Sequence, residues 1–231
     1  MSRTLNVIRM QLVNRQTYIW VPLLVLGGAL LITLAIWGVL AGSGIDTAKY
    51  GGGAQAPLWY FAAVGAQALT RTFPFSQAMS VTRREFYLGT LLTAGVTSAL
   101  LAVIFVIGGL LETATNGWGM NGYFFALDWI WAAGPLAAGF FYFAMAMLFF
   151  VVGFAFATIF KRFGSLWLTV VLIGLALLFI GGLWVIGQAN AWVQVFTWFA
   201  TAGAGALALL MAGVAAVLAV VSFPVLRRAV P

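Results

Sequence analysis

The sequence predicts an all-α membrane protein, a bundle of six transmembrane helices, and three observations lead to this fold class. Of the 231 residues, 64% are apolar and only 6% are charged, whereas a soluble domain is about half apolar and a quarter charged. The apolar residues form continuous runs of the roughly 20 residues that a helix needs to cross the bilayer. These runs lack the alternation that is typical of a membrane β-barrel.

Each expected element follows from one of these runs or from the segment beside it. The spans are expected at about 19–41, 57–73, 88–111, 136–159, 165–187 and 202–224. The fourth begins after Gly134-Pro135, because proline interrupts a helix. The basic segment 1–18 is expected as an in-plane helix. The loop 188–201 is too apolar to be solvated and too short to span, so a helix on the outer leaflet is expected. Residues 1–231 form a single transmembrane domain.

The positions of the basic residues predict that both termini are cytoplasmic, because cytoplasmic loops carry an excess of Lys and Arg. In this orientation the outer side receives only Lys49, together with Asp46, Glu112 and Asp128. The cytoplasmic side receives Arg3, Arg9, Arg15, Arg71, Arg83, Arg84, Lys161, Arg162, Arg227 and Arg228. Inverting the chain would reverse this asymmetry.

The residue inventory argues against catalysis in this chain. There is no Cys and no His, which removes the usual nucleophile, general base and soft metal ligands. The four acidic residues are expected in loops or at a helix start, so no ionisable residue lies well inside a span. No G-x-x-x-x-G-K-[ST] phosphate loop occurs. The net charge of +7 is scattered between apolar runs, which does not fit nucleic-acid binding. We therefore expect no enzyme, no metal site and no cofactor in the chain itself.

The connection from the second to the third span, TFPFSQAMSVTRREFYL, is the most informative segment. Pro74 suits the first turn of a helix. Helical spacing predicts two faces, of which the apolar one is expected to rest on the bundle and the polar one to face the cytosol. The apolar face comprises Phe75, Ala78, Met79 and Phe86, and the polar face comprises Ser76, Gln77, Ser80 and Arg84.

A new helix is expected to begin directly after this segment. Thr82-Arg83-Arg84-Glu85 has the capping-box pattern, with Thr82 as N-cap and Glu85 at the third helical position. The segment therefore predicts a short interfacial helix, a turn near Val81, and a freshly capped helix that enters the third span. It is either a docking element for a soluble cytoplasmic subunit or an interfacial loop whose arginines only set the topology.

The stretch PFSQAMSVTRREFYLGT resembles the coupling-helix region of ABC-2-type ABC transporter permeases, and the six-span layout resembles that family over the whole chain. The resemblance implies a second permease copy, identical or related, and two cytoplasmic ABC ATPase subunits, which would carry the ATP and Mg. It implies that residues 74–87 transmit ATPase closure to the spans. The coupling residues would be Pro74, Phe75, Ser76, Gln77, Met79, Ser80, Thr82, Arg83, Arg84 and Glu85.

The same resemblance implies a substrate path along spans two and five, in the cytoplasmic membrane of a bacterium. The path candidates are Trp59, Tyr60, Gln67, Trp167 and Trp184. Apolar path residues suit a hydrophobic or amphipathic cargo such as an antibiotic, an antimicrobial peptide or a lipid. No ATPase domain is fused to these spans, which is unlike the full-length fused transporters.

Two other functions fit a six-helix chain of this length. One is the substrate-capture subunit of a vitamin-type importer, which would bind its vitamin tightly in isolation. The other is a membrane scaffold or regulator that transports nothing, for which the absence of charge within the spans is equally suitable. The identity of the cargo and of the second permease stays open.

Overall fold

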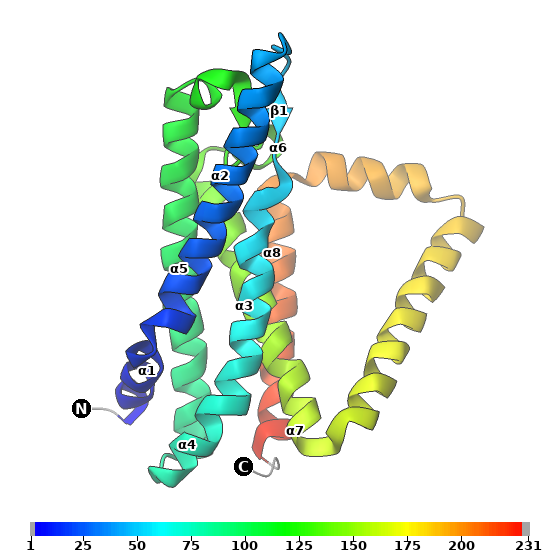
Figure 1. Cartoon of the computed structure of the whole chain (residues 1–231). Helices are drawn as coiled ribbons and strands as arrows, with labels where there is room; N and C mark the ends of the chain where they lie inside the picture. The colour runs from blue at the N-terminus through cyan, green and yellow to red at the C-terminus, as the bar shows by residue number, and fades with distance from the viewer. Residues whose placement is uncertain (1–2, 228–231) are drawn as a thin grey trace.

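The computed structural model describes residues 3–227, with side chains from residue 6 onward, and its fold is that of an all-α membrane protein (Figure 1). Within this part of the chain, four helices are long and apolar enough to cross a membrane. They are Gln16–Gly42, which joins the π-helical turn η1 (Gln16–Trp20) to α2 (Val21–Gly42), then α5 (Arg83–Ala114), α7 (Pro135–Gln188) and α8 (Trp192–Arg227). Arg228 lies outside the described residues.

Two of these helices are broken at a glycine. Gly164 divides α7, and Gly203 divides α8, each with a positive φ inside the helix. The expected spans 136–159 and 165–187 thus lie on either side of Gly164. The expected outer helix, 188–201, ends just before Gly203, and the expected last span, 202–224, begins one residue before it. Gly134, with φ 89°, precedes the helix start at Pro135, so the predicted break at Gly134-Pro135 is confirmed.

The expected second span consists of α3 (Ala56–Gln67) followed by the π-helical turn η3 (Ala68–Thr72). It packs against the first half of α7 with direct backbone contact. A Cβ atom on Gly65 would lie 2.0 Å from the Phe150 carbonyl oxygen, and one on Gly153 would lie 1.9 Å from the Ala62 carbonyl oxygen. Small residues allow such close approach between helices in a membrane, so α3 and the first half of α7 form the tightest part of the bundle.

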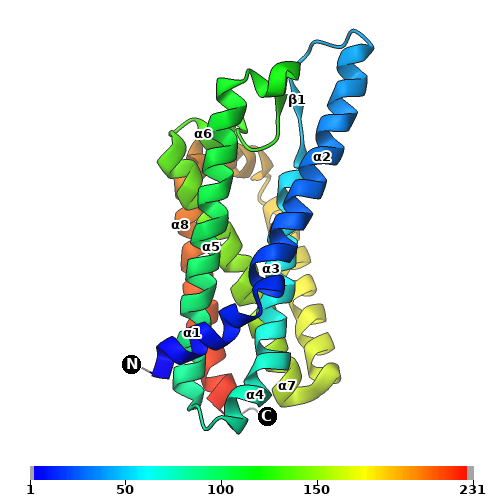
Figure 2. The ribbon, with the colours of Figure 1, turned by 60° about the vertical axis from the view of Figure 1, so that its left-hand side comes forward.

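Within the segment 1–18, which was expected as an in-plane helix, the chain forms α1 (Arg3–Val13), which lies across the foot of α5 (Figure 2). Val7 and Gln11 face α5 and are each about 1% exposed. The Gln11 side-chain amide donates a hydrogen bond to the Thr90 hydroxyl on α5 at 2.7 Å. α1, α4 (Phe73–Ala78) and the last turn of α8 lie at one end of the bundle, which we call the α4 end (Figure 1).

The opposite end carries a folded cap, and we call it the β1 end. Its strands β1 (Lys49–Tyr50) and β2 (Gly122–Tyr123) pair in parallel. The cap also contains the 3₁₀ turn η2 (Gly52–Gln55), the turn η4 (Gly117–Asn121) and the short helix α6 (Asp128–Trp131). Asn116 and Asn121, each followed by glycine in the sequence, have the positive φ that such turns adopt.

The second half of α7 and the first part of α8 leave the bundle together. Residues 165–188 diverge from the other helices as a single rod, and residues 192–202 run back from the far end of the rod to the last helix, outside the bundle (Figure 1). We call these two pieces the arm. Four successive residues of the rod, Leu177 to Ile180, are each at least 59% exposed. Since successive helical residues point in all directions, no side of the rod is packed here.

Candidate functional site

The α4 hairpin, residues 73–82, connects η3 at the end of the expected second span to the start of α5. Pro74 lies in the first turn of α4, as predicted. The chain then turns at Ser80, which has φ 57°. The turn is closed by the Val81 N–H, which donates to the Ser76 carbonyl at 3.1 Å, and by the Gln77 amide, which donates to the Val81 carbonyl at 3.1 Å. The hairpin therefore holds its shape without a partner.

The predicted faces are wrong within α4 and at Met79, but they are confirmed beyond it. Phe86 is buried, and Ser80 and Arg84 are exposed, as predicted. Phe75 and Met79 are 57% and 59% exposed, whereas Ser76 is fully buried and its hydroxyl donates to the Phe73 carbonyl at 2.7 Å. The physical reason is that Phe73 and Phe86 fill the inner side, with ring centroids 5.2 Å apart. Phe75 and Met79 thus project away from the bundle, while Phe73 packs inward.

The predicted capping box is confirmed at the start of α5. The Thr82 N–H donates to the Glu85 carboxylate at 3.0 Å, and the Glu85 N–H donates to the Thr82 hydroxyl at 3.2 Å. Such a cap satisfies two backbone donors that a helix start would leave unpaired. The Arg83 guanidinium donates to the Arg227 carbonyl at the end of α8. Arg84 instead lines a groove between α5 and α8.

The residues of the expected substrate path are not brought together within one chain. Trp59 is 65% exposed on α3 and packs edge-on against Phe149, with ring centroids 4.8 Å apart. Tyr60 and Gln67 are half-buried on the same helix. Trp167 and Trp184 lie on the arm, 55% and 65% exposed. Within the described residues, no ring contact or hydrogen bond joins the two groups.

Glu112 was expected in a loop, and this prediction is wrong. It lies in the last turns of α5 and is fully buried. Its carboxylate accepts hydrogen bonds from the N–H groups of Phe124, Phe125 and Ala126 at 2.6, 2.8 and 2.7 Å, and from the Trp118 indole at 2.7 Å. A buried carboxylate needs such donors because desolvation of the charge is otherwise costly. Glu112 is therefore the centre around which the cap folds.

Other polar contacts extend the cap from this centre. Lys49 is only 7% exposed and donates to the Met120 carbonyl at 3.0 Å. The Tyr142 hydroxyl and the Trp131 indole both donate to the Phe125 carbonyl, at 2.6 and 3.1 Å. The sequence analysis missed this network, because it joins side chains far apart in the sequence to backbone groups that carry no sequence signal.

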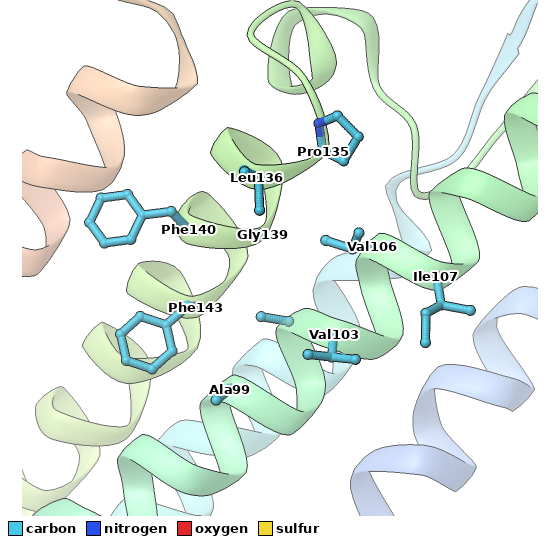
Figure 3. Close-up of a pocket in the computed structure, with 10 residues that line it drawn as sticks. Ala99, Val103, Val106, Ile107, Pro135, Leu136, Gly139, Phe140 and Phe143 are labelled. Atoms are coloured by element: carbon cyan, nitrogen blue, oxygen red, sulfur yellow. The ribbon is translucent and has the colours of Figure 1, made fainter.

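An apolar groove of about 420 Å³ lies between α5 and the start of α7, toward the β1 end (Figure 3). Val103 and Val106 of α5 face Pro135, Phe140 and Phe143 of α7 across it (Figure 3). Its lining residues carry no charged or polar side chain. Such a groove can take a hydrocarbon surface but cannot recognise a polar group.

The described residues form an exposed apolar tip on α4 and an apolar groove between α5 and α7. Within residues 3–227, no cluster of three or more acidic residues could hold a metal ion. The buried carboxylate of Glu112 is saturated by four donors from its own chain. No family model, characterised relative or solved structure matches the chain.

Proposed function

We propose that this chain is the permease subunit of an ATP-driven ABC exporter. Two copies, identical or related, would join two cytoplasmic ATPase subunits that bind ATP and Mg. The complex would move a hydrophobic or amphipathic cargo across a bacterial cytoplasmic membrane. The α4 hairpin would receive the motion of the ATPases and pass it to the two long helices on either side of it.

The exposed apolar tip of α4 is the observation that carries this proposal. Phe75 and Met79 project from the hairpin at the α4 end, more than half exposed, although Ser76 beside them is buried. A soluble partner with an apolar cleft would cover both side chains. Exposed aromatic and Met side chains are also typical of the anchors at protein interfaces. The hairpin is braced by the capping box and by Phe73 against Phe86, so a push on the tip reaches α3 and α5 directly.

Charge supports the assignment of the α4 end to the cytoplasm. Lys49 lies in β1 at the opposite end of the molecule (Figure 1). Arg9, Arg71, Arg83 and Arg227 belong to elements at the α4 end. With the α4 end in the cytoplasm, most basic residues lie on the cytoplasmic side, as in other membrane proteins. It would then cross the membrane six times, with α3 and η3 forming one crossing and α7 forming two.

The arm supports a second permease copy. Its rod, residues 165–188, has large apolar side chains on every side, and Leu178 and Phe179 are 74% and 68% exposed. A rod that leaves its own bundle offers a surface to another copy as well as to lipid. Two copies could then enclose a path lined by Trp167 and Trp184 from the arm and by Trp59 from α3. This arrangement would assemble the path residues that a single chain keeps apart.

The decisive experiment tests the α4 tip in the full chain. A tagged protein with Phe75→Ser and Met79→Ser would be purified from its native membrane beside the unchanged protein. The retained proteins would be identified, and ATP hydrolysis by the eluate would be measured. We expect the unchanged protein to retain a stoichiometric soluble subunit with a G-x-x-x-x-G-K-[ST] motif and to hydrolyse ATP. The double variant should lose both.

The matched control is Ile45→Ser, which removes an apolar side chain, 42% exposed, near the β1 end. It should keep the ATPase. Thermal unfolding should be unchanged in both variants, because neither affects the packed core. Retention of the ATPase by the double variant would contradict the docking role of α4. An unchanged protein that purifies alone, without ATP hydrolysis, would contradict the exporter proposal as a whole.

A further inference from the structure

A second apolar groove lies at the α4 end, with arginine side chains at its mouth. Its first section, about 310 Å³, runs between α5 and α8 and is lined by Arg84, Tyr87, Leu91, Ala219 and Phe223 among others. A further section of about 240 Å³ continues toward α7 and shares Leu91 and Ala219 with the first. The two sections form one continuous furrow, which we call the Arg84 groove.

The mouth of the groove is positively charged and offers donors to which no residue between 6 and 227 is hydrogen-bonded. Arg84 is exposed, and no hydrogen bond or ion pair within the described residues occupies its guanidinium. The Arg227 guanidinium lies 5.9 Å from the centre of the Phe223 ring, which itself lines the groove. The nearby acidic side chain, Glu85, is held in the capping box. An anion at the mouth would therefore meet two arginines.

The groove has the depth of one leaflet. Along α8 it runs from Phe223 at the mouth to Ala212, a rise of about 16 Å at 1.5 Å per residue. The hydrocarbon core of a bilayer is about 30 Å thick, so one leaflet contributes roughly half of that. Beyond the mouth, the lining is apolar apart from the Tyr87 hydroxyl, which already donates to the Ala219 carbonyl.

We propose that the Arg84 groove binds one anionic phospholipid of the leaflet at the α4 end. Its phosphate lies between Arg84 and Arg227, and one acyl chain follows the groove along Leu91 and Ala219. Basic pockets between membrane helices suit anionic headgroups, and a basic residue near the surface favours them. The lipid joins the start of α5 to the end of α8. This site requires a membrane but no ATPase and no cargo, so it stands or fails separately from the exporter proposal.

The test is lipid binding to the full chain in a mild detergent. Phosphatidylglycerol and phosphatidylcholine are titrated separately, and bound lipid is counted by native mass spectrometry. We expect one phosphatidylglycerol per chain, and weaker binding of phosphatidylcholine. Arg84→Gln should weaken phosphatidylglycerol binding about fivefold. Ala219→Phe, which fills the groove where its two sections meet, should weaken binding of both lipids.

The control is Arg162→Gln, which removes an arginine at the same end, stacked on Phe163 and remote from the groove. It should leave binding unchanged. An equal loss in Arg162→Gln would indicate diffuse surface charge and overturn the site. Unchanged lipid binding by Ala219→Phe would overturn the position of the acyl chain in the groove. If this variant keeps its lipid but changes from a dimer to a monomer, the groove binds a second copy of the chain instead. If Ala219→Phe does not fold, Val220→Trp narrows the same groove from a side chain that is 72% exposed.

Discussion

Replacement of Gly65 by alanine should separate α3 from α7 and destabilise the bundle. The added Cβ would lie 2.0 Å from the Phe150 carbonyl oxygen and 2.9 Å from the carbonyl carbon. Both atoms belong to the backbone, so no side chain can rotate away. The helices would have to move apart by more than about 1 Å before ordinary contact is restored.

The magnitude follows from two opposing effects. Overpacking costs about 1–3 kcal/mol, and the rigid neighbour places this site in the upper part of that range. Alanine favours a helix over glycine by about 0.8–1 kcal/mol. The free energy of unfolding should therefore fall by about 1–2 kcal/mol. At roughly 2–4 °C per kcal/mol for a chain of this size, the Tm should fall by several degrees.

The assay is thermal unfolding in detergent, followed by intrinsic tryptophan fluorescence. The chain has ten tryptophans, and among them Trp59 packs against Phe149 across the same two helices, so its share of the emission reports this contact. The matched control is Gly95→Ala in α5, where a Cβ would meet nothing within 4 Å; its Tm should be unchanged or higher. A Tm for Gly65→Ala equal to that of the control would refute the close helix contact. Separation of the two helices would relieve the clash at both Gly65 and Gly153. The double variant Gly65→Ala/Gly153→Ala should therefore lose less free energy of unfolding than the sum of the losses in the two single variants.

Two further predictions concern the cap at the β1 end. Glu112→Gln should lower the free energy of unfolding by roughly 3 kcal/mol. The carboxylate accepts through both oxygens, whereas an amide accepts through only one of its two polar atoms. Each buried donor that is left unpaired costs about 1–3 kcal/mol. Thermal unfolding checks this prediction. The control is Asp46→Asn, which replaces an exposed acid and should leave the Tm unchanged. Equal Tm values for Glu112→Gln and Asp46→Asn would contradict the prediction. The pKa of Tyr50 should lie above its ordinary value of 10.0, because its hydroxyl donates to the Asp128 carboxylate at 2.8 Å. This bond contributes to stability below the unfolded pKa, and its contribution is lost as the pH rises through the folded one. The absorbance of the Tyr50 phenolate is obtained as the difference between the protein and its Tyr50→Phe variant during a pH titration. In Asp128→Asn this phenolate should form at lower pH. An unchanged midpoint of the Tyr50 titration would contradict the hydrogen bond.

The features that could be predicted from the sequence are those set by neighbouring residues. The capping box of Thr82 and Glu85, the helix start at Pro135 and the turn at Asn116 each depend on a few residues of local chemistry. The face of α4 could not be predicted, because it depends on Phe73, just before the helical pattern considered, meeting Phe86 on the next helix. The role of Glu112 and the Gly65 contact depend on segments that only the tertiary fold brings together.

The direction of the arm is set by backbone conformation and not by packing. A Cβ atom on Gly164 or Gly203 would meet nothing within 4 Å, yet both residues combine a positive φ with a ψ near 180°. This region of backbone conformation is open essentially only to glycine. Both glycines are thus required by the turns themselves. The rest of the bundle is fixed by contacts that tolerate little change, at Gly65 and around Glu112. In the proposed exporter, a push on α4 would therefore move α3, α5 and the first half of α7 as one body. The arm could keep its place against a second copy, because neither glycine at its two joints is itself held by close contacts.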